Sequence, residues 1–593
     1  MRWHLRSADP ALVAQLSSEA GIAPEIARLL VLRGVSTAPE AQRFLSPRLE
    51  HLHSPYLMQG MRPAVERIRA AIANQETILI YGDYDVDGTT AIVILKTAIE
   101  RLGGTCDFHV PHRIREGYGM KDDVIERAAA AGVRLIISVD TGIRAFTAAE
   151  TARRLGVDLI VTDHHLPEAT EGVPRAAAVL NPNQPGCEYP CKALCGAGVA
   201  FKVVQALLEG TPDQRLLPSF LKMVAIATVA DAVPLTGENR VIAKLGLDGL
   251  RDPRNVGLKA LIEVAALDLS KRVRAGDIAF KLAPRINAAG RMDVAQDVID
   301  LFCSKDAARA QEIALKLNQL NTDRQQEEKR IIEEACARID GDTALRESYC
   351  MVVDGPGWHR GVVGIAATRV VERYHRPALV VSIEGEEAHG SGRSIPAFHL
   401  LDALDACGDL FTRYGGHAHA VGFALPAARV PQLRAALDTF ARARLTPADL
   451  DPSLEADGEL SVDQITPQLY RSLCALEPYG VGNPEPVFLA HGLNVVQPPR
   501  ILKEKHVKLR LAQNSGGAPS KPGFGLGGRA MDALGWRMAE RVAQDGFLVG
   551  DSVDLAFTLD MNDHPDFGGL QLVIEDVKRA TVAVAAQPAA AGD

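Results

Sequence analysis

Four clusters of acidic and imidazole side chains, each at the end of an apolar run, most constrain what this chain can fold into. In order, they are Asp83-Tyr84-Asp85-Val86-Asp87-Gly88, Asp140, Asp163-His164-His165 and Asp231. In open parallel α/β sheets, the carboxyl ends of the strands share one edge, and ligands bind at that edge. The four clusters therefore predict a divalent-metal site that acts on phosphate and is assembled from distant parts of the sequence.

The segments between the clusters alternate between strand-like and helix-like patterns. Apolar runs at 77–81, 134–139, 158–161 and 176–180 predict buried strands, and helical patterns lie near 89–101, 121–131 and 145–155. This alternation predicts an α/β fold with a parallel sheet and right-handed crossovers. Every candidate ligand in the first three clusters then lies at the carboxyl end of a strand.

A chain of 593 residues is too long for one hydrophobic core and is expected to divide into several domains. Residues 306–338 lack Gly and Pro, which predicts a long helix, and short β-like pieces after residue 446 predict a small barrel. The expected parts are a helical leader (1–70), a catalytic α/β domain (71–235), a helical extension (236–305), a connecting helix (306–340), a second α/β domain (341–445), a β-barrel (446–580) and a disordered tail (581–593).

Composition leaves nucleic acid open as a substrate and gives no sign of a membrane protein. The net charge is −9, but a local basic groove matters more for nucleic-acid binding than the total charge. The first ten residues lack a signal-peptide core, so we expect a cytoplasmic protein. Nine cysteines favour reduced thiols, and the spacing of Cys187, Cys191 and Cys195 leaves zinc as a minor alternative because no fourth ligand is evident.

The ligand types in the clusters favour Mn²⁺ or Mg²⁺. Hard carboxylate oxygens with one or two imidazoles suit these ions better than a closed zinc site. Two such ions can activate a water molecule and neutralise the charge that develops on a phosphodiester. The first cluster also matches the opening of an EF-hand loop, but Ile94 stands where the loop requires Glu.

Further segments supply side chains suited to phosphate. Segments 285–291, 390–394 and 415–422 combine small residues with arginine, hydroxyl or imidazole groups, and their candidate phosphate ligands are Arg285, Asn287, Arg291, Ser391, Arg393 and His417. In segment 390–394, flexible backbone donors, hydroxyls and a guanidinium together predict a phosphate cradle. Residues 500–510 hold five Lys or Arg against one Glu and include Lys503, Lys505 and Lys508. These lysines predict a basic nucleic-acid-binding face, or alternatively a solvated edge strand.

These motifs resemble a known family. Asp163-His164-His165 resembles the signature of the DHH phosphoesterase superfamily, and Gly415-Gly416-His417-Ala418 resembles its associated DHHA1 domain. Segments 82–88, 230–235, 285–291 and 390–394 together resemble the RecJ family of single-stranded-DNA-specific exonucleases. The resemblance spans about residues 60–580 and rests on a specific combination of motifs.

The resemblance implies a DHH catalytic domain, a long connecting helix, a DHHA1 substrate-binding domain and a C-terminal OB-fold. It also implies a 5′→3′ exonuclease that releases mononucleotides from single-stranded DNA in recombination and repair. Carried over by position, the metal ligands are Asp85, Asp87, Asp140, His164 and Asp231. Asp140, His164 and His165 are then the expected catalytic residues, and Ser391 and Arg393 bind the 5′-terminal phosphate.

One position departs from the family pattern, and two residues have open roles. Some relatives carry His where this chain has Tyr81, and Asp83 is the candidate replacement ligand. Tyr118 is expected to stack on a base, with Arg113 near phosphate, although a purely structural tyrosine is an equal alternative.

Two other functions remain open. One is a relative that hydrolyses very short oligonucleotides or cyclic dinucleotides, and the other is a catalytically inactive protein that only binds single strands. For the favoured exonuclease, a helicase and a single-strand-binding protein are candidate partners, and a monomer is expected.

Overall fold

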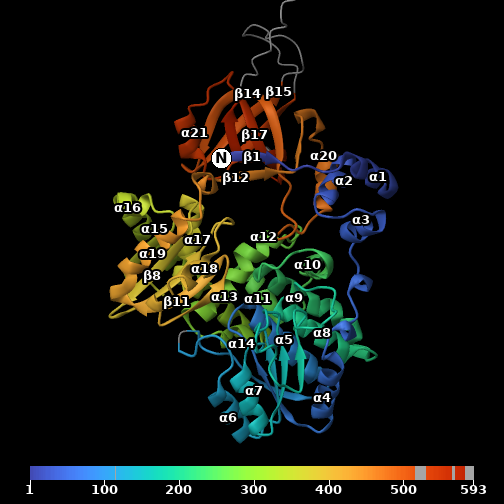
Figure 1. Cartoon of the computed structure of the whole chain (residues 1–593). Coiled ribbons are helices and arrows are strands. Elements are labelled where there is room, and N and C mark those ends of the chain that lie inside the picture. The colour runs from blue at the N-terminus through green and yellow to red at the C-terminus, as the bar shows by residue number, and fades with distance from the viewer. Residues whose placement is uncertain (114, 514–528, 564–567, 581–593) are drawn as a thin grey trace, which may run out of the picture. The chain divides into compact units, whose positions relative to one another are not determined.

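The computed structural model describes residues 1–113, 115–513, 529–563 and 568–580 (Figure 1). The chain divides into two compact units, which we describe separately. The first contains Met1–Ser46, Ser453–Tyr479 and Asn483–Asp593, and the second contains Pro47–Pro452 with Gly480–Gly482. Among the described residues, the helices are all too short or too polar to cross a bilayer.

The second unit begins with a five-stranded parallel sheet in the order β3-β2-β4-β5-β6. Its strands are β2 (Thr77–Tyr81), β3 (Thr105–His109), β4 (Leu135–Val139), β5 (Asp158–Thr162) and β6 (Ala178–Leu180). The surrounding helices are α4 (Met61–Ala73), α5 (Val86–Arg101), α6 (Asp122–Ala130), α7 (Phe146–Arg154) and α8 (Gly196–Leu208). The predicted parallel sheet is confirmed.

Alternating residues of this sheet enter two different cores, as expected for a parallel sheet covered on both faces. Ile78, Ile80 and Ile137 belong to a buried cluster with residues of α4, α5 and α8. Leu79 and Ile136 belong to a second cluster with residues of α6 and α7. Helices therefore cover both faces, and the carboxyl edge of the sheet remains for the polar clusters.

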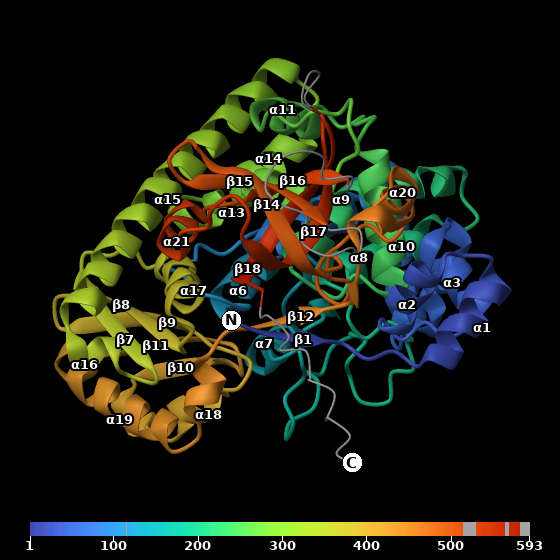
Figure 2. The same ribbon diagram turned by 90° about the horizontal axis from the view of Figure 1, so that it is seen from above.

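Helices fill the middle of the second unit. They are α9 (Leu217–Ala230), α10 (Gly237–Gly249), α11 (Val256–Val264), α12 (Ala275–Asp277), a π-helical turn (Ile278–Leu282), α13 (Ala283–Met292) and α14 (Gln296–Cys303). They lead into α15 (Ala307–Gly341), which Figure 2 shows running from the α11 region to the sheet of β7–β9. This helix confirms the predicted connection between two α/β domains.

A second, mixed sheet follows α15 in the order β10-β11-β9-β8-β7. Its strands are β7 (Met351–Pro356), β8 (Ala378–Glu384), β9 (Glu387–Arg393), β10 (Arg413–His417) and β11 (Ala420–Pro426), with helices α16 (Thr343–Arg346), α17 (Val363–Tyr374), α18 (Leu400–Asp405) and α19 (Val430–Arg442). The backbone of residues 390–393, expected to be flexible, lies within β9, because β8 and β11 supply hydrogen-bonding partners on both of its sides. The phosphate cradle itself stays a prediction.

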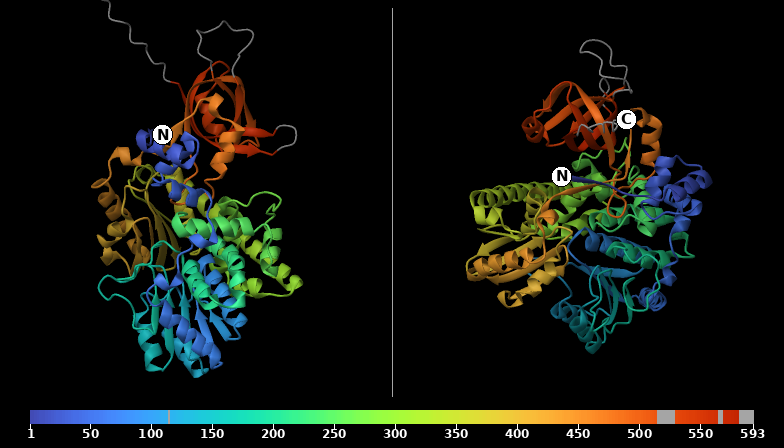
Figure 3. Two further views of the ribbon diagram at one scale, coloured as in Figure 1. Left: turned by 90° about the vertical axis from the view of Figure 1, so that its right-hand side faces the viewer. Right: turned by 45° about the horizontal axis from the view of Figure 1, so that its top comes forward.

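The first unit is built around a β-barrel. Strands β14 (Phe488–Leu502), β15 (His506–Gln513), β16 (Ala530–Gly535), β18 (Gly569–Arg579) and β17 (Ser552–Asn562) pair in that order. Additional pairing of β17 with β14 closes the ring, and Figure 3 shows the closed barrel in orange and red. The predicted C-terminal barrel, of the OB type, is confirmed.

The N-terminal segment is more complex than a helical leader. β1 (Arg2–Leu5) pairs in parallel with β12 (Ser453–Ala456) in the first unit. Helices α1 (Pro10–Ala20), α2 (Pro24–Val31) and α3 (Ala38–Leu45) belong to the same unit, whereas α4 belongs to the second. Residues 1–70 are thus divided between the two units.

Candidate metal centre and arginine cluster

The loop after β2 delivers the first cluster of carboxylates. Asp85 caps α5, because its Oδ1 accepts from the backbone N–H groups of Asp87 (2.9 Å) and Gly88 (3.1 Å). This cap explains why α5 begins at Val86, earlier than the sequence pattern suggests. Gly88 is required here, since a Cβ atom at this position would lie 2.6 Å from backbone atoms of Asp83.

Asp87 is fixed from the opposite side by the start of α8. Its Oδ2 accepts from the Gly196 N–H at 2.6 Å and its Oδ1 from the Ala197 N–H at 2.7 Å. The amino terminus of a helix favours negative charge, so α8 stabilises the ionised carboxylate. A Cβ atom at Gly196 would lie 2.5 Å from the Asp140 side chain, so only glycine lets α8 approach this closely.

Asp140 lies at the end of β4 in an unusual conformation. Its φ of 58° is in the left-handed region, which Asp and Asn tolerate better than most residues. The side chain is buried, and its Oδ1 accepts no well-formed hydrogen bond, although His164 Nε2 lies 3.2 Å away. The buried Oδ1 of Asp83 also lacks one. Buried carboxylate oxygens without partners are costly, and cations satisfy them.

His164 joins the carboxylates into one site. Its Nε2 lies 3.2 Å from Asp140 Oδ1 and 3.8 Å from both Asp87 Oδ2 and Asp231 Oδ2. The described part of the chain contains three groups of potential ligands, and within each group the ligand atoms lie within 4.8 Å of one another. These groups are Asp140, His164 and His165; Asp87, His164 and Asp231; and Asp83, Asp85 and Asp140.

Asp163 has a different task from its neighbours. Its Oδ1 accepts from the N–H groups of His164 (2.7 Å) and His165 (3.1 Å) and lies 2.7 Å from His165 Nδ1. Its Oδ2 accepts from the Ile143 N–H at 2.9 Å. With its oxygens engaged in this way, Asp163 shapes the turn that aims the two histidines. The sequence pattern alone did not reveal this role.

The crowding of carboxylates shifts the pKa values of several side chains in the site. Burial first, and repulsion between carboxylates second, hold the pKa values of Asp83 and Asp140 well above the ordinary value. The same causes raise the pKa of Asp231 to about 9. Burial lowers the pKa of His164, which favours the neutral imidazole that a metal requires.

These observations test whether the site fits the divalent ions expected from the sequence. It offers carboxylate oxygens and one or two imidazoles, two unpartnered buried oxygens and a large unbalanced negative charge, which fits Mn²⁺ or Mg²⁺. Cysteine takes part in none of the potential metal groups found among the described residues. Nothing in those residues therefore supports the zinc alternative.

An arginine cluster, made of Arg113, Arg291, Arg324 and Arg393, lies in the same unit. Burial lowers the pKa of Arg291 to about 10, and repulsion from Arg113, Arg324 and Arg393 adds to this shift. Arg291 also donates to the Gly361 carbonyl at 2.9 Å, which ties α13 to the loop before α17. Mutually repelling, buried guanidinium groups are suited to an anionic ligand such as phosphate.

Ser391 and Arg393 lie at the start of α17. Arg393 donates to the Ser391 hydroxyl at 3.2 Å, and an added Cβ atom at Gly364 would lie 3.0 Å from that hydroxyl. Arg393 is also one of the charges that lower the pKa of His417, after burial and His419. The structure therefore places Ser391 and Arg393 at a helix amino terminus, and His417 is near enough for the charge of Arg393 to lower its pKa.

The remaining candidates have more varied places. Asn287 Oδ1 accepts from the Val86 N–H at 3.2 Å and thus contacts the metal-binding loop. Arg285 donates to Asn318 of α15 at 3.0 Å. The Tyr118 hydroxyl lies 3.3 Å from His165 Nδ1, and the Arg113 guanidinium lies 5.0 Å from the centre of the Tyr84 ring.

Tyr81 and the lysines make other contacts. The Tyr81 hydroxyl donates to the Gly119 carbonyl, so this side chain is used in the core beside α6. Lys503 and Lys505 are exposed at the turn between β14 and β15 of the first unit, and Lys508 pairs with Asp532 at 2.8 Å.

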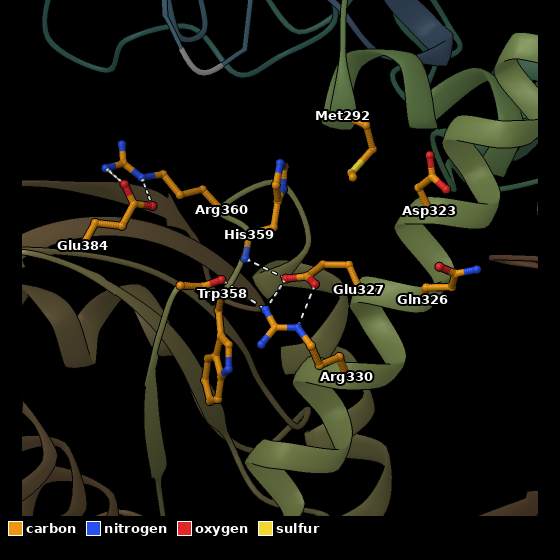
Figure 4. A pocket seen from close by; sticks show the side chains of 10 residues that line it. Met292, Asp323, Gln326, Glu327, Arg330, Trp358, His359, Arg360 and Glu384 are labelled. Atoms are coloured by element: carbon orange, nitrogen blue, oxygen red, sulfur yellow. Dashed lines mark hydrogen bonds and ion pairs between the residues drawn. The ribbon is translucent and has the colours of Figure 1, made fainter.

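A cleft of about 990 Å³ opens between α15 and the loop at 357–360 (Figure 4). Its arginines already have carboxylate partners. Arg330 pairs with Glu327 at 2.7 Å, and Arg360 pairs with Glu384. Because these charges are balanced, the cleft is less suited to phosphate than the arginine cluster around Arg291.

Comparison with known proteins places this geometry in a family. Models of the DHH family N-terminal domain, the DHHA1 domain and the RecJ OB domain match residues 77–228, 347–443 and 456–576. The single-stranded-DNA-specific exonuclease RecJ of Escherichia coli is 34% identical over 592 residues, which cover 97% of this chain and 98% of the relative. The chain belongs to the RecJ family.

Other RecJ proteins agree with this assignment. RecJ of Bacillus subtilis is 37% identical over 579 residues, covering 97% of this chain and 70% of the relative. The crystal structure of RecJ in complex with Mn²⁺ from Thermus thermophilus superposes with a TM-score of 0.81 at 30% identity, covering 98% of this chain and 80% of that chain. The family resemblance expected from the motifs is confirmed.

Proposed function

We propose that this chain is a metal-dependent exonuclease that hydrolyses single-stranded DNA from its 5′ end and releases 5′-mononucleotides. The observation that carries the proposal is the meeting of Asp87, Asp140, His164 and Asp231 in one buried site. Asp83 and Asp85 complete the set of ligands for two Mn²⁺ or Mg²⁺ ions. When bound, these ions activate a water molecule and neutralise the developing charge on phosphate.

The protein's own groups account for the other requirements of the reaction. In the proposal, His165 contacts the scissile phosphate, and in the metal-free protein its pKa is raised to about 9. Burial opposes the charged imidazole, and the hydrogen bond to Asp163 more than offsets the effect. Arg291, Ser391 and Arg393 bind the 5′-terminal phosphate, which gives the enzyme a direction along the strand.

The context of the activity follows from the same assignment. The relatives are named single-stranded-DNA-specific exonucleases, and the OB barrel with Lys503, Lys505 and Lys508 offers a basic surface for one strand. We place the enzyme in recombination and repair in the cytoplasm, acting as a monomer. A helicase and a single-strand-binding protein are its candidate partners.

The test uses a single-stranded oligonucleotide labelled at its 3′ end, with Mn²⁺ or Mg²⁺ and a duplex control. The expected result is progressive shortening of the single strand with release of mononucleotides, while the duplex persists. Asp140→Asn abolishes this activity, because Asn keeps the backbone conformation and removes the charge. Asp107→Asn, at an exposed aspartate on β3, leaves the activity unchanged and serves as the matched control.

Two results support the competing functions. Cleavage of dinucleotides or other very short substrates alone would identify a small-substrate phosphodiesterase. Binding of the oligonucleotide without cleavage in either metal would identify a protein that only binds single strands. Shortening from the 3′ end would retain the nuclease and overturn its polarity.

A further inference from the structure

The segment from α12 to α13 carries an exposed aromatic side chain that the metal centre and the arginine cluster do not use. α12, the π-helical turn and α13 follow one another without a break, so they form one helical rod. Phe280 lies in the π-helical turn and is 77% exposed. A row of exposed or half-exposed residues follows the rod, and the π-helical turn interrupts its regular α-helical spacing: Gly276, Phe280, Pro284, Asn287 and Arg291.

Two residues of this row belong to the candidate site. Asn287 contacts the metal-binding loop through the Val86 N–H, and Arg291 belongs to the arginine cluster. Phe280 lies seven residues before Asn287, which corresponds to about 10 Å along a helix axis. The order along the rod is therefore arginine cluster, metal-binding loop and aromatic ring.

A single exposed apolar residue is ordinary on a protein surface and needs no function. Two observations distinguish Phe280 from that case. A π-helical turn is rare and often marks a functional site. In addition, an added Cβ atom at Gly276 would lie 3.9 Å from the Phe280 ring, so the ring extends along the row towards Gly276.

We infer that Phe280 is a stacking platform for a base of the single strand on the 3′ side of the cut, an inference that rests on the proposed function. A strand whose 5′-terminal phosphate lies near Arg291 and whose scissile bond lies at the metal centre continues towards Phe280. Stacking on an aromatic ring suits an enzyme that accepts any sequence, because every base has a π-face.

The test uses 3′-labelled single strands, each with one abasic nucleotide at a different distance from the 5′ end. With the wild-type enzyme, removal of the terminal nucleotide slows when the abasic position faces Phe280, within the first few nucleotides. Phe280→Ala lowers kcat/KM on intact strands by about 5- to 100-fold and loses this sensitivity to the abasic position. Phe280→Trp restores both.

Leu315→Ala is the matched control, because Leu315 is an exposed apolar residue on α15, 53% exposed, outside the row. Equal thermal midpoints for all variants exclude unfolding as the cause. The inference is overturned if Phe280→Ala keeps the wild-type abasic profile. If the wild type shortens no strand, the proposed function fails. The role of Phe280 is then decided by measuring, in EDTA, the affinity of wild type and Phe280→Ala for the same series of abasic strands.

Discussion

His164 Nε2 lies 3.2 Å from Asp140 Oδ1, although the two residues follow different strands. The pairing of β4 with β5 explains the distance. Val139 is opposite Thr162 in the parallel register, so the residues beyond each strand emerge side by side. The register of two apolar strands therefore sets the geometry of the metal centre.

Asp140→Asn should abolish metal-dependent cleavage and weaken metal binding by more than about a hundredfold. Loss of a hydrogen-bonding partner of a ligand already costs 10- to 100-fold, so loss of a direct ligand should cost more. Asn tolerates the left-handed φ of this position, so the fold should persist. Calorimetric titration with Mn²⁺ measures the effect, and unchanged binding would remove Asp140 from the ligand set.

Binding of Mn²⁺ or Mg²⁺ at pH 7 should release protons. The pKa of Asp231 is raised to about 9 by burial and the neighbouring Asp87 and Asp85, so most of this carboxyl is protonated at pH 7 in the metal-free protein. The metal displaces that proton. The number of protons released should fall as the pH rises through 9, and Asp231→Asn should reduce that number at pH 7. Calorimetry in buffers of different ionisation enthalpy measures it, and buffer-independent heats would contradict the prediction.

The carboxyl-edge position of Asp85, Asp140 and His164 could be predicted from sequence because it depends on local pattern alone. Each follows a short apolar run, and the alternation with helices fixes a parallel sheet. The task of Asp163 could not be predicted in this way. Whether a carboxylate binds a metal or backbone N–H groups depends on the turn geometry around it.

Features that depend on distant partners were also beyond the sequence pattern. β1 is a strand because β12, far along the chain, supplies its hydrogen-bonding partner. Residues 390–393 are rich in Gly and Ser and still form β9, since strands flank them on both sides. Phe280 was missed because a single aromatic residue in a helical pattern usually belongs to the core, and a π-helical turn changes the face on which it lies.

Arg393→Gln should remove the preference for a 5′-phosphate. In wild type, we expect faster cleavage of a 5′-phosphorylated strand than of a 5′-hydroxyl strand, because Arg393 and Ser391 contact each other at the start of α17. The variant should cleave both at similar, lower rates, with a loss of about 10-fold or more on the phosphorylated strand. Arg444→Gln, at an exposed arginine of the same domain, changes the net charge equally and should keep the preference. A preference retained in Arg393→Gln would contradict this role.

Asp163→Asn should destabilise the metal-free protein by about 3 kcal/mol, because Asn keeps only one of the two acceptor oxygens that serve the buried N–H groups and His165 loses its charged partner. The pKa of His165 is about 9 in the folded protein, above its ordinary value of 6.5. The stabilisation that depends on the charged His165 is therefore complete below pH 6.5 and is lost as the pH rises through 9. The stabilisation that depends on the ionised Asp163 is lost at more acidic pH, as the pH falls through the lowered pKa of Asp163.

The difference in thermal midpoint between wild type and Asp163→Asn should therefore be larger at pH 6 than at pH 9.5 in EDTA. Asp158→Asn is the control, because Asp158 is more than half exposed in its pair with Arg67 and a surface pair contributes at most about 1 kcal/mol. A difference that stays constant between the two pH values would show that the hydrogen bonds to the backbone, rather than the pairing with the charged imidazole, account for the stabilisation by Asp163.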